Sequence, residues 1–163
     1  MTTETRTYSY EARQPDVAKM MSMAGLDYLR GILSGEFPAA PIAATLGFAP
    51  TEFEHGRAVF EGTPERYTYN PLGSVHGGWA ATILDSAMGC AVHTTLPAGK
   101  GYTTVDLDIK LVRAITSRVG KLRCEAKIIH SGGSIATAEG RVTDEAGTLY
   151  AHGTTTCAVL TAR

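Results

Sequence analysis

Apolar residues recur along this chain at two different spacings, and the change from one to the other separates helices from strands. From Pro15 onward they return every three or four positions, which predicts an amphipathic helix over residues 15–34. Asp16 lies in its first turn, where a negative charge suits the helix dipole, and Gly35 and Pro38 follow where the helix should end. The apolar positions are Val17, Met20, Met21, Ala24, Tyr28, Ile32 and Leu33.

The longest apolar segment, residues 77–96, predicts a second helix. It is apolar on nearly every side and rich in small residues, which is the composition of a helix buried on most of its faces. Pro97 and Gly99 end it. Between the two helices we expect a connector at 38–41, short strands at 46–55 and 57–62 that meet at His55-Gly56, and a loop at 64–76 with Asn-Pro and Gly as breakers.

After the second helix the spacing of apolar residues changes to two. Val105, Leu107, Ile109 and Leu111 alternate with charged residues, which predicts a strand with one solvent-exposed face. Three further strands are expected at 119–130, 134–144 and 148–160, with turns at Ser131-Gly132-Gly133 and Glu145-Ala146-Gly147.

This order of elements predicts an α+β fold. Strands that follow one another through tight turns pair antiparallel, so the six strands should form one antiparallel sheet with an apolar face. The buried helix at 77–96 can cover that face. The chain has 163 residues and no internal repeat, which suits one globular domain with a sizeable core.

Composition and charge exclude several classes of function. The formal net charge is −1, without the basic excess of a nucleic-acid-binding surface, and no apolar run reaches about 18 residues, so we expect no membrane span. The N-terminus lacks the apolar stretch of a secretory signal. The three cysteines are far apart and the five histidines form no HxH or HxxxH pair, so we expect a cytoplasmic protein with reduced thiols and no metal site.

Asp85 is the candidate catalytic residue. It is the only acidic side chain between Tyr67 and Gly99, a stretch that contains no Lys or Arg. A carboxylate in an apolar helix is costly to bury unless it is paired or hydrogen-bonded, and such carboxylates are candidate general bases or nucleophiles. The alternative is that Asp85 lies on the one solvent-exposed stripe of the helix. Its neighbours do not resemble a solvated face: they are Ala81, Thr82, Met88 and Gly89.

The tripeptide His76-Gly77-Gly78 stands immediately before that helix. Its two glycines allow a ligand to approach the backbone closely, and their N–H groups lie at the helix N-terminus, where free donors and the dipole favour negative charge. Gly77 N–H therefore suits an oxyanion hole for a thioester carbonyl under attack. Alternatively, the glycines only form a tight turn into the helix and His76 is a capping or packing residue.

These residues together resemble a known family. The string Asn70-Pro71-Leu72-Gly73-Ser74-Val75-His76-Gly77-Gly78, with Asp85 nine residues after His76, resembles the hotdog-fold thioesterases of the phenylacetyl-CoA (PaaI-like) branch. The later string TTVDLDIKLVRA resembles the strand that follows the helix in that family. The resemblance implies a hotdog domain at 42–163, in which a six-stranded antiparallel sheet wraps a long central helix, and an N-terminal extension at 1–41 with an amphipathic helix.

The resemblance also implies an activity, the hydrolysis of an acyl-CoA thioester to free acid and CoA, with no cofactor beyond the CoA of the substrate. Asp85 would attack the thioester or activate water, and Gly77 N–H would hold the oxyanion. His76 would orient or polarise the thioester, and Asn70 would position the carboxylate or water from the opposite subunit. The implied assembly is a homodimer with its sites between the subunits, and a homotetramer built from such dimers.

Other residues are expected to bind substrate. The CoA phosphates would meet Arg113 and the turn Ser131-Gly132-Gly133, and Gly78, Trp79 and Ser86 would line the site, although Trp79 would equally suit the core. The chain departs from the family at two positions. Gly89 stands where some relatives carry a Ser or Thr one helical turn beyond the acid, and Ala114 replaces the usual Pro after the strand arginine.

Two other functions remain open on the same fold. One is a non-catalytic module that binds or senses acyl-CoA, against which the acid at position 85 argues. The other is hydration of an enoyl thioester, which normally uses an Asp and a His about five residues apart on one segment, whereas Asp85 follows His76 by nine.

Overall fold

The computed structural model describes residues 3–161, and the first helices differ from the expected single helix over 15–34. They are α1 (Val17–Met21) and α2 (Gly25–Ser34). At the break the helical bond from Gly25 to Met21 is replaced by two long-range ones, because Gly25 N–H donates to the Leu96 oxygen at 3.0 Å and the Met21 oxygen accepts from Gly99 N–H at 2.7 Å. Gly25 also sits directly against a later helix, since a Cβ there would lie 1.9 Å from the backbone oxygen of His93. The expected end of the helix is confirmed, since Gly35 caps α2 in the left-handed conformation at φ 80°.

A third short helix, α3 (Pro41–Leu46), corrects the expectation of a connector followed by a strand from residue 46. Its signals are local. Pro41 occupies the first turn, where its missing N–H costs nothing, and Gly47 ends the helix at φ 73°. The helix is only six residues long, which is too short for a periodic pattern to reveal.

All six expected strands are present, with bounds that differ by a few residues from the predicted ones. The sheet is antiparallel throughout, in the order β1-β2-β4-β5-β6-β3. The strand that follows the long helix therefore does not pair with its successor but with the last strand, at the far edge of the sheet. The strands are β1 (Phe48–Glu54), β2 (Arg57–Gly62), β3 (Lys100–Leu111), β4 (Leu122–Ser131), β5 (Ile135–Thr143) and β6 (Leu149–Thr161).

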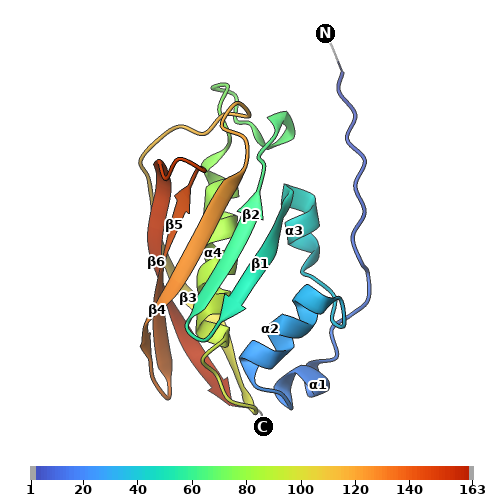
Figure 1. Ribbon diagram of the computed structural model, residues 1–163, viewed down its shortest axis with the longest axis vertical. Helices are drawn as coiled ribbons and strands as arrows, with labels where there is room; N and C mark the ends of the chain where they lie inside the picture. The colour runs from blue at the N-terminus through green and yellow to red at the C-terminus, as the bar shows by residue number, and fades with distance from the viewer. Residues whose placement is uncertain (1–2, 162–163) are drawn as a thin grey trace.

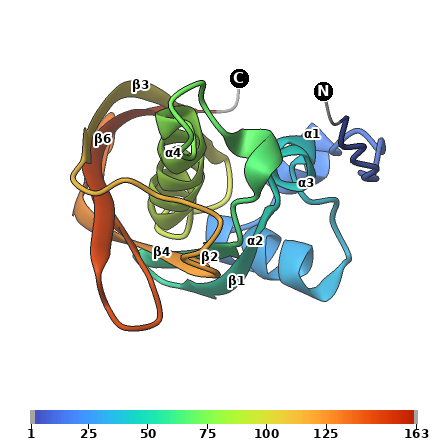
Figure 2. The same ribbon diagram turned by 90° about the horizontal axis from the view of Figure 1, so that it is seen from above.

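The long helix α4 (Gly77–His93) lies inside the curve of the sheet, as Figure 2 shows. It ends three residues before the predicted Leu96, because the Thr94 side chain bonds back to the carbonyl oxygen of Ala91. A 3₁₀ turn (Arg66–Thr68) lies in the loop before it. The side chains of α4 that face the sheet are fully buried and form the centre of the core: Ile83, Leu84, Ala87, Met88 and Ala91.

The curved sheet leaves one side of α4 open between its two edge strands, β1 and β3. Figure 2 shows α2 and α3 beside this open side, and both helices contact β1 (Figure 1). Along α4 the uncovered stripe is half-buried and comprises Ala81, Thr82, Asp85, Ser86 and Cys90. None of the helices among residues 3–161 has the length and hydropathy needed to cross a bilayer.

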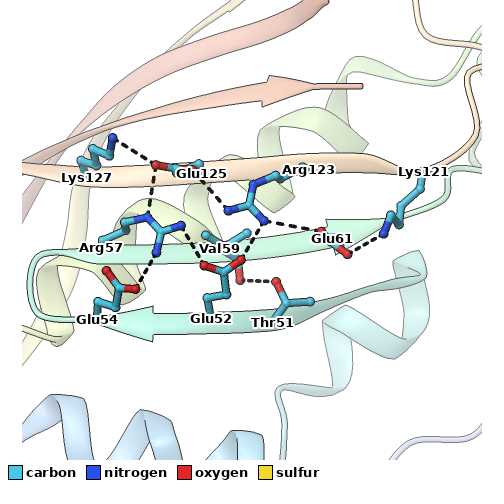
Figure 3. Close-up of polar contacts among 10 residues, drawn as sticks. All are labelled: Thr51, Glu52, Glu54, Arg57, Val59, Glu61, Lys121, Arg123, Glu125 and Lys127. Carbon is cyan, nitrogen blue, oxygen red and sulfur yellow. Dashed lines mark hydrogen bonds and ion pairs between the residues drawn. The ribbon is translucent and has the colours of Figure 1, made fainter. Parts of the chain in front are cut away.

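The outer face of the sheet carries a network of ion pairs across β1, β2 and β4 (Figure 3). Arg57 contacts Glu52 at 2.8 Å and Glu125 at 3.2 Å, and Arg123 contacts Glu52 at 2.9 Å. Partial burial alone would raise the pKa of Glu125, but hydrogen bonds from Arg57 and Lys127 outweigh it and lower this pKa to about 2. The network lies on the solvent side of the sheet, on the face opposite the one that packs against α4.

Candidate active site

Asp85 lies on the uncovered stripe of α4, directly opposite the edge strand β3. Its Oδ1 accepts a hydrogen bond of 3.1 Å from the hydroxyl of Thr104. No Lys, Arg or His forms an ion pair with Asp85 within residues 3–161. The carboxylate therefore keeps its acceptor capacity for a water molecule or a substrate, which a salt bridge would occupy.

Thr104 is a site residue that the sequence pattern did not identify. A β-bulge interrupts β3 between Thr104 and Asp106, so that Val105 has no partner in β6 and is 66% exposed. A bulge shifts the alternation of side chains by one position and re-aims its neighbours. As a result Tyr102 and Thr104 face α4 together with Leu107 and Ile109, although strict alternation would put them on opposite faces.

The N-terminus of α4 presents a free backbone donor. His76 is the N-cap residue, and its Nδ1 accepts the N–H of Gly78 at 2.9 Å, which assigns the ring proton to Nε2. Gly77 N–H meets no acceptor in the described part of the chain. A Cβ on Gly77 would lie 2.5 Å from Cδ1 of Leu111, so this glycine also accommodates a side chain from β3.

A cleft of about 280 Å³ beside this terminus brings together four residues predicted to form the site. They are Asn70, His76, Gly77 and Arg113. The Asn70 side chain is engaged within its own loop, where Oδ1 accepts the N–H of Leu72 at 2.8 Å and Nδ2 donates to the Ser74 hydroxyl at 3.1 Å. In the single chain Asn70 thus shapes the loop that leads to the helix terminus.

The two halves of the predicted catalytic set do not meet within one chain. Asp85 follows Gly77 by eight residues in the same helix, which at 1.5 Å per residue separates them by about 12 Å along the axis. They also open onto different hollows, because Asp85 and Ser86 line a second pocket of about 240 Å³ between α4, β1 and the N-terminal helices.

The surroundings of Asp85 make the nearby thiol an unsuitable nucleophile. Burial, with a smaller contribution from the charge of Asp85, raises the pKa of Cys90 to about 12. Burial likewise raises the pKa of Tyr102, whose hydroxyl lies where a Cβ on Gly89 would be only 2.7 Å away. Gly89 therefore makes room for the Tyr102 ring, which explains why this position carries no Ser or Thr.

The remaining predicted substrate residues are dispersed. Trp79 is 2% exposed and donates its Nε1–H to the Leu46 oxygen at 2.8 Å, so it packs in the core and lines neither hollow. Gly78 is exposed at the start of α4. The turn 131–133 lies beyond the opposite end of α4, where the Ser131 hydroxyl meets that of Thr95 at 2.8 Å. Within residues 3–161 no cluster of His, Cys, Asp and Glu could hold a metal ion.

Comparisons with known proteins place this geometry in a family context. Residues 72–151 match the family described as the thioesterase superfamily. A candidate esterase of Halobacterium salinarum is 36% identical over 84 residues, which are 50% of this chain and 54% of that protein. The chain thus spans about half the length of this curated relative.

Two solved structures extend the comparison to the fold. A candidate thioesterase of Ralstonia eutropha, related to phenylacetic acid degradation, matches with a TM-score of 0.73 and 28% identity, over 80% of this chain and 98% of that one. A Streptococcus mutans protein bound to acetyl-CoA matches with a TM-score of 0.64 and 23% identity, over 72% of this chain and 91% of that one. The expected architecture, a long helix wrapped by a six-stranded antiparallel sheet, is confirmed.

Proposed function

We propose, from the premise that this chain is a PaaI-like member of the thioesterase superfamily with the hotdog fold, that it hydrolyses acyl-CoA thioesters to a free acid and CoA. The observation that carries the proposal is the Asp85 carboxylate, which has no ion-pair partner among the described residues and lies at the wall of an apolar pocket. Acetyl-CoA bound to a neighbour of the same fold supports a CoA ester as the substrate.

The chemistry assigns one role to each group. Asp85 either takes a proton from the attacking water or attacks the thioester carbon itself, and the Thr104 hydroxyl holds the carboxylate in place. The carbonyl oxygen becomes negative as the new C–O bond forms, and Gly77 N–H and His76 Nε2–H donate to it. The C–S bond then breaks, and the CoA thiolate leaves and takes up a proton, which Asp85 has taken from the water where it acts as the base. Where Asp85 is the nucleophile, this step leaves an acyl-Asp85 anhydride, and a water molecule then cleaves it to the free acid and regenerates the carboxylate.

The proposed site needs two copies of the chain. A thioester group cannot touch Asp85 and Gly77 of one copy when the two lie about 12 Å apart along α4. Strand β3 forms a free sheet edge with exposed apolar side chains, including Val105 and Leu111, and can pair antiparallel with the same edge of a second copy. Each copy then supplies its carboxylate to the helix terminus of the other, and the implied homotetramer would join two such dimers.

The CoA moiety has a proposed path in this dimer. Arg113 lies beside the free N-terminus of α4, where its guanidinium group can bind a phosphate of CoA. Antiparallel pairing reverses the second copy, so its Ser131-Gly132-Gly133 turn points toward the N-terminal end of α4 in the first. The hydrogen bonds of the Asn70 side chain hold the loop that leads to this terminus of α4.

The test is the release of free thiol from acetyl-, octanoyl- and phenylacetyl-CoA by the wild type and by Asp85→Asn. We expect the variant to lose turnover by on the order of a thousandfold or more, since it removes the carboxylate proposed to activate water or to attack the thioester. Asp27→Asn, at an exposed position of α2 that does not line the pocket, is the matched control and should keep full activity. Equal turnover by wild type and Asp85→Asn would contradict the assignment.

A second candidate function is an acyl-CoA binding or sensing module without catalysis. It would be established by a folded, dimeric sample that binds an acyl-CoA tightly and leaves the thioester intact over hours.

Mixing two inactive variants tests whether the site is shared. Asp85→Asn retains the helix terminus, and Gly77→Pro retains the carboxylate, so a mixed dimer has one intact site only if each site draws on both chains. Half of the dimers in an equal mixture are mixed, and one of their two sites works, which gives about a quarter of wild-type activity. Absence of any recovery after verified subunit exchange would place the whole site in one chain.

A further inference from the structure

The pocket beside Asp85 is enclosed by parts of the chain that are far apart in sequence. Asp85 and Ser86 on α4 and Thr104 on β3 supply its polar end. Its floor is aromatic, because Phe53 and Phe60 lie edge to face with ring centres 6.0 Å apart, and both rings are almost fully buried. An apolar hollow that ends on a carboxylate is suited to an apolar group attached to a reactive carbonyl.

The outer wall of this pocket comes from the N-terminal helices. Leu29 and Ile32 of α2, Ala40 between the helices, and Ile42 of α3 all line it. Figure 1 shows α2 and α3 standing beside β1, and the family match begins only at residue 72, after this wall. Ile42 lines the pocket and is nevertheless 48% exposed, so it lies at the opening. The wall thus comes from residues that precede the matched range 72–151, as do β1 and β2 of the sheet.

The volume of the pocket limits what can fill it. It holds about 240 Å³, and a protein cavity of about 150 Å³ binds the six carbons of benzene, so this pocket has room for roughly eight to ten non-hydrogen atoms. Octanoyl and phenylacetyl groups have this size. An acetyl group would leave most of the pocket empty, and a lauroyl group would extend beyond it.

We propose that α2 and α3 form a specificity wall that selects an apolar acyl group of about eight non-hydrogen atoms. This inference rests on the function proposed above, because it places the acyl group in the pocket that Asp85 closes. The wall draws on the predicted N-terminal extension at 1–41, which holds α2 and Ala40, and on α3 at the start of the predicted hotdog domain at 42–163. Ala40 and Ile32 are its specificity-determining residues.

Two variants change the wall in opposite directions. Ala40→Leu adds bulk at a position with extended backbone (φ −63°, ψ 126°) and no side-chain cap to lose, so it should narrow the pocket without harming α3. Ile32→Ala widens the pocket. Leu33→Ala is the matched control, because Leu33 is the next residue of α2 but is 42% exposed and does not line the pocket.

The measurement is kcat/KM for acyl-CoA esters from butyryl to lauroyl, with phenylacetyl-CoA as the aromatic probe. In the wild type we expect a gain of about fourfold for each added methylene up to octanoyl, followed by a plateau or a decline. Ala40→Leu should lower the ratio of octanoyl to butyryl at least about tenfold, and Ile32→Ala should move the optimum to longer chains. Leu33→Ala should keep the wild-type profile. The ranking of octanoyl and phenylacetyl identifies whether a chain or a ring fills the pocket.

Failure of this inference differs from failure of the proposed function. Robust hydrolysis with one profile for all four proteins would overturn the wall and leave the thioesterase intact. If no ester is hydrolysed, binding still tests the specificity wall. The affinities of butyryl-, octanoyl- and lauroyl-CoA are then measured by titration into Asp85→Asn, with and without Ala40→Leu. If the affinity rises with chain length and falls with Ala40→Leu, the specificity wall stands although the thioesterase activity does not. If the affinity depends on neither chain length nor Ala40→Leu, the specificity wall is refuted.

Discussion

Replacing Gly77 by proline would delete one backbone N–H from the proposed site while preserving the helix that presents it. Gly77 is the first residue of α4, a position where proline is favoured because no intrahelical acceptor waits for its N–H. The preceding residue, His76, has φ −60° and ψ 135°, the extended conformation that proline requires before it. We therefore expect a folded protein with α4 intact.

The expected loss follows from the role of that N–H. Removal of one oxyanion-hole donor typically lowers kcat by about 10²–10³, or about 2.7–4 kcal/mol of transition-state stabilisation. A steric effect could also lower kcat in this variant, because any Cβ at Gly77 would lie 2.5 Å from Cδ1 of Leu111. That atom is the end of a flexible side chain that is 55% exposed, so it can move aside at small cost.

Gly77→Ala separates the two effects, because alanine brings the same Cβ but keeps the N–H. Thiol release under steady-state conditions should show kcat near wild type for Gly77→Ala, within about tenfold, and a further fall of at least about a hundredfold for Gly77→Pro. Circular dichroism and size exclusion check that both are folded dimers. Equal kcat values for the alanine and proline variants would refute the oxyanion role of Gly77 N–H.

Three further predictions concern other parts of the structure. Thr104→Val removes the hydroxyl that donates to the proposed catalytic carboxylate of Asp85, and should lower kcat on the order of tenfold to a hundredfold with little change in the thermal midpoint. Gly25→Ala should lower the thermal midpoint measured by calorimetry, because its Cβ would lie 1.9 Å from the His93 oxygen and overpacking costs about 1–3 kcal/mol. The pKa of Glu125 is about 2 in the folded protein, below its unfolded value, so its stabilising contribution is present at neutral pH and is lost as pH falls toward 2. Glu125→Gln should therefore lower the urea midpoint more at pH 7 than at pH 3, and Glu145→Gln, which has no ion pair among the described residues, should leave both midpoints unchanged.

Local patterns were sufficient for most of the fold. The six strands, the buried helix at 77–93 and the end of α2 at Gly35 follow from period, breakers and caps, which act over a few residues. The break before Gly25 and the short helix at 41–46 escaped this reasoning. The first depends on hydrogen bonds from Gly25 to Leu96 and from Gly99 to Met21, residues that lie far apart in the chain, and the second has too few turns for periodicity.

The sequence by itself determined the candidate chemistry. Asp85 is an isolated acid in an apolar helix, and His76 and Gly77 stand at its N-terminus, so one segment of the sequence supplies both the candidate carboxylate and the candidate oxyanion donor. The tertiary structure alone decided what surrounds them. It paired β3 with β6 rather than with β4, it placed the bulge that turns Thr104 toward Asp85, and it set α2 and α3 against the open side of α4. These outcomes depend on contacts between residues that are distant in the chain. The free energy of packing the whole sheet against the helix outweighs local preferences there, so the pattern along the sequence does not predict these contacts.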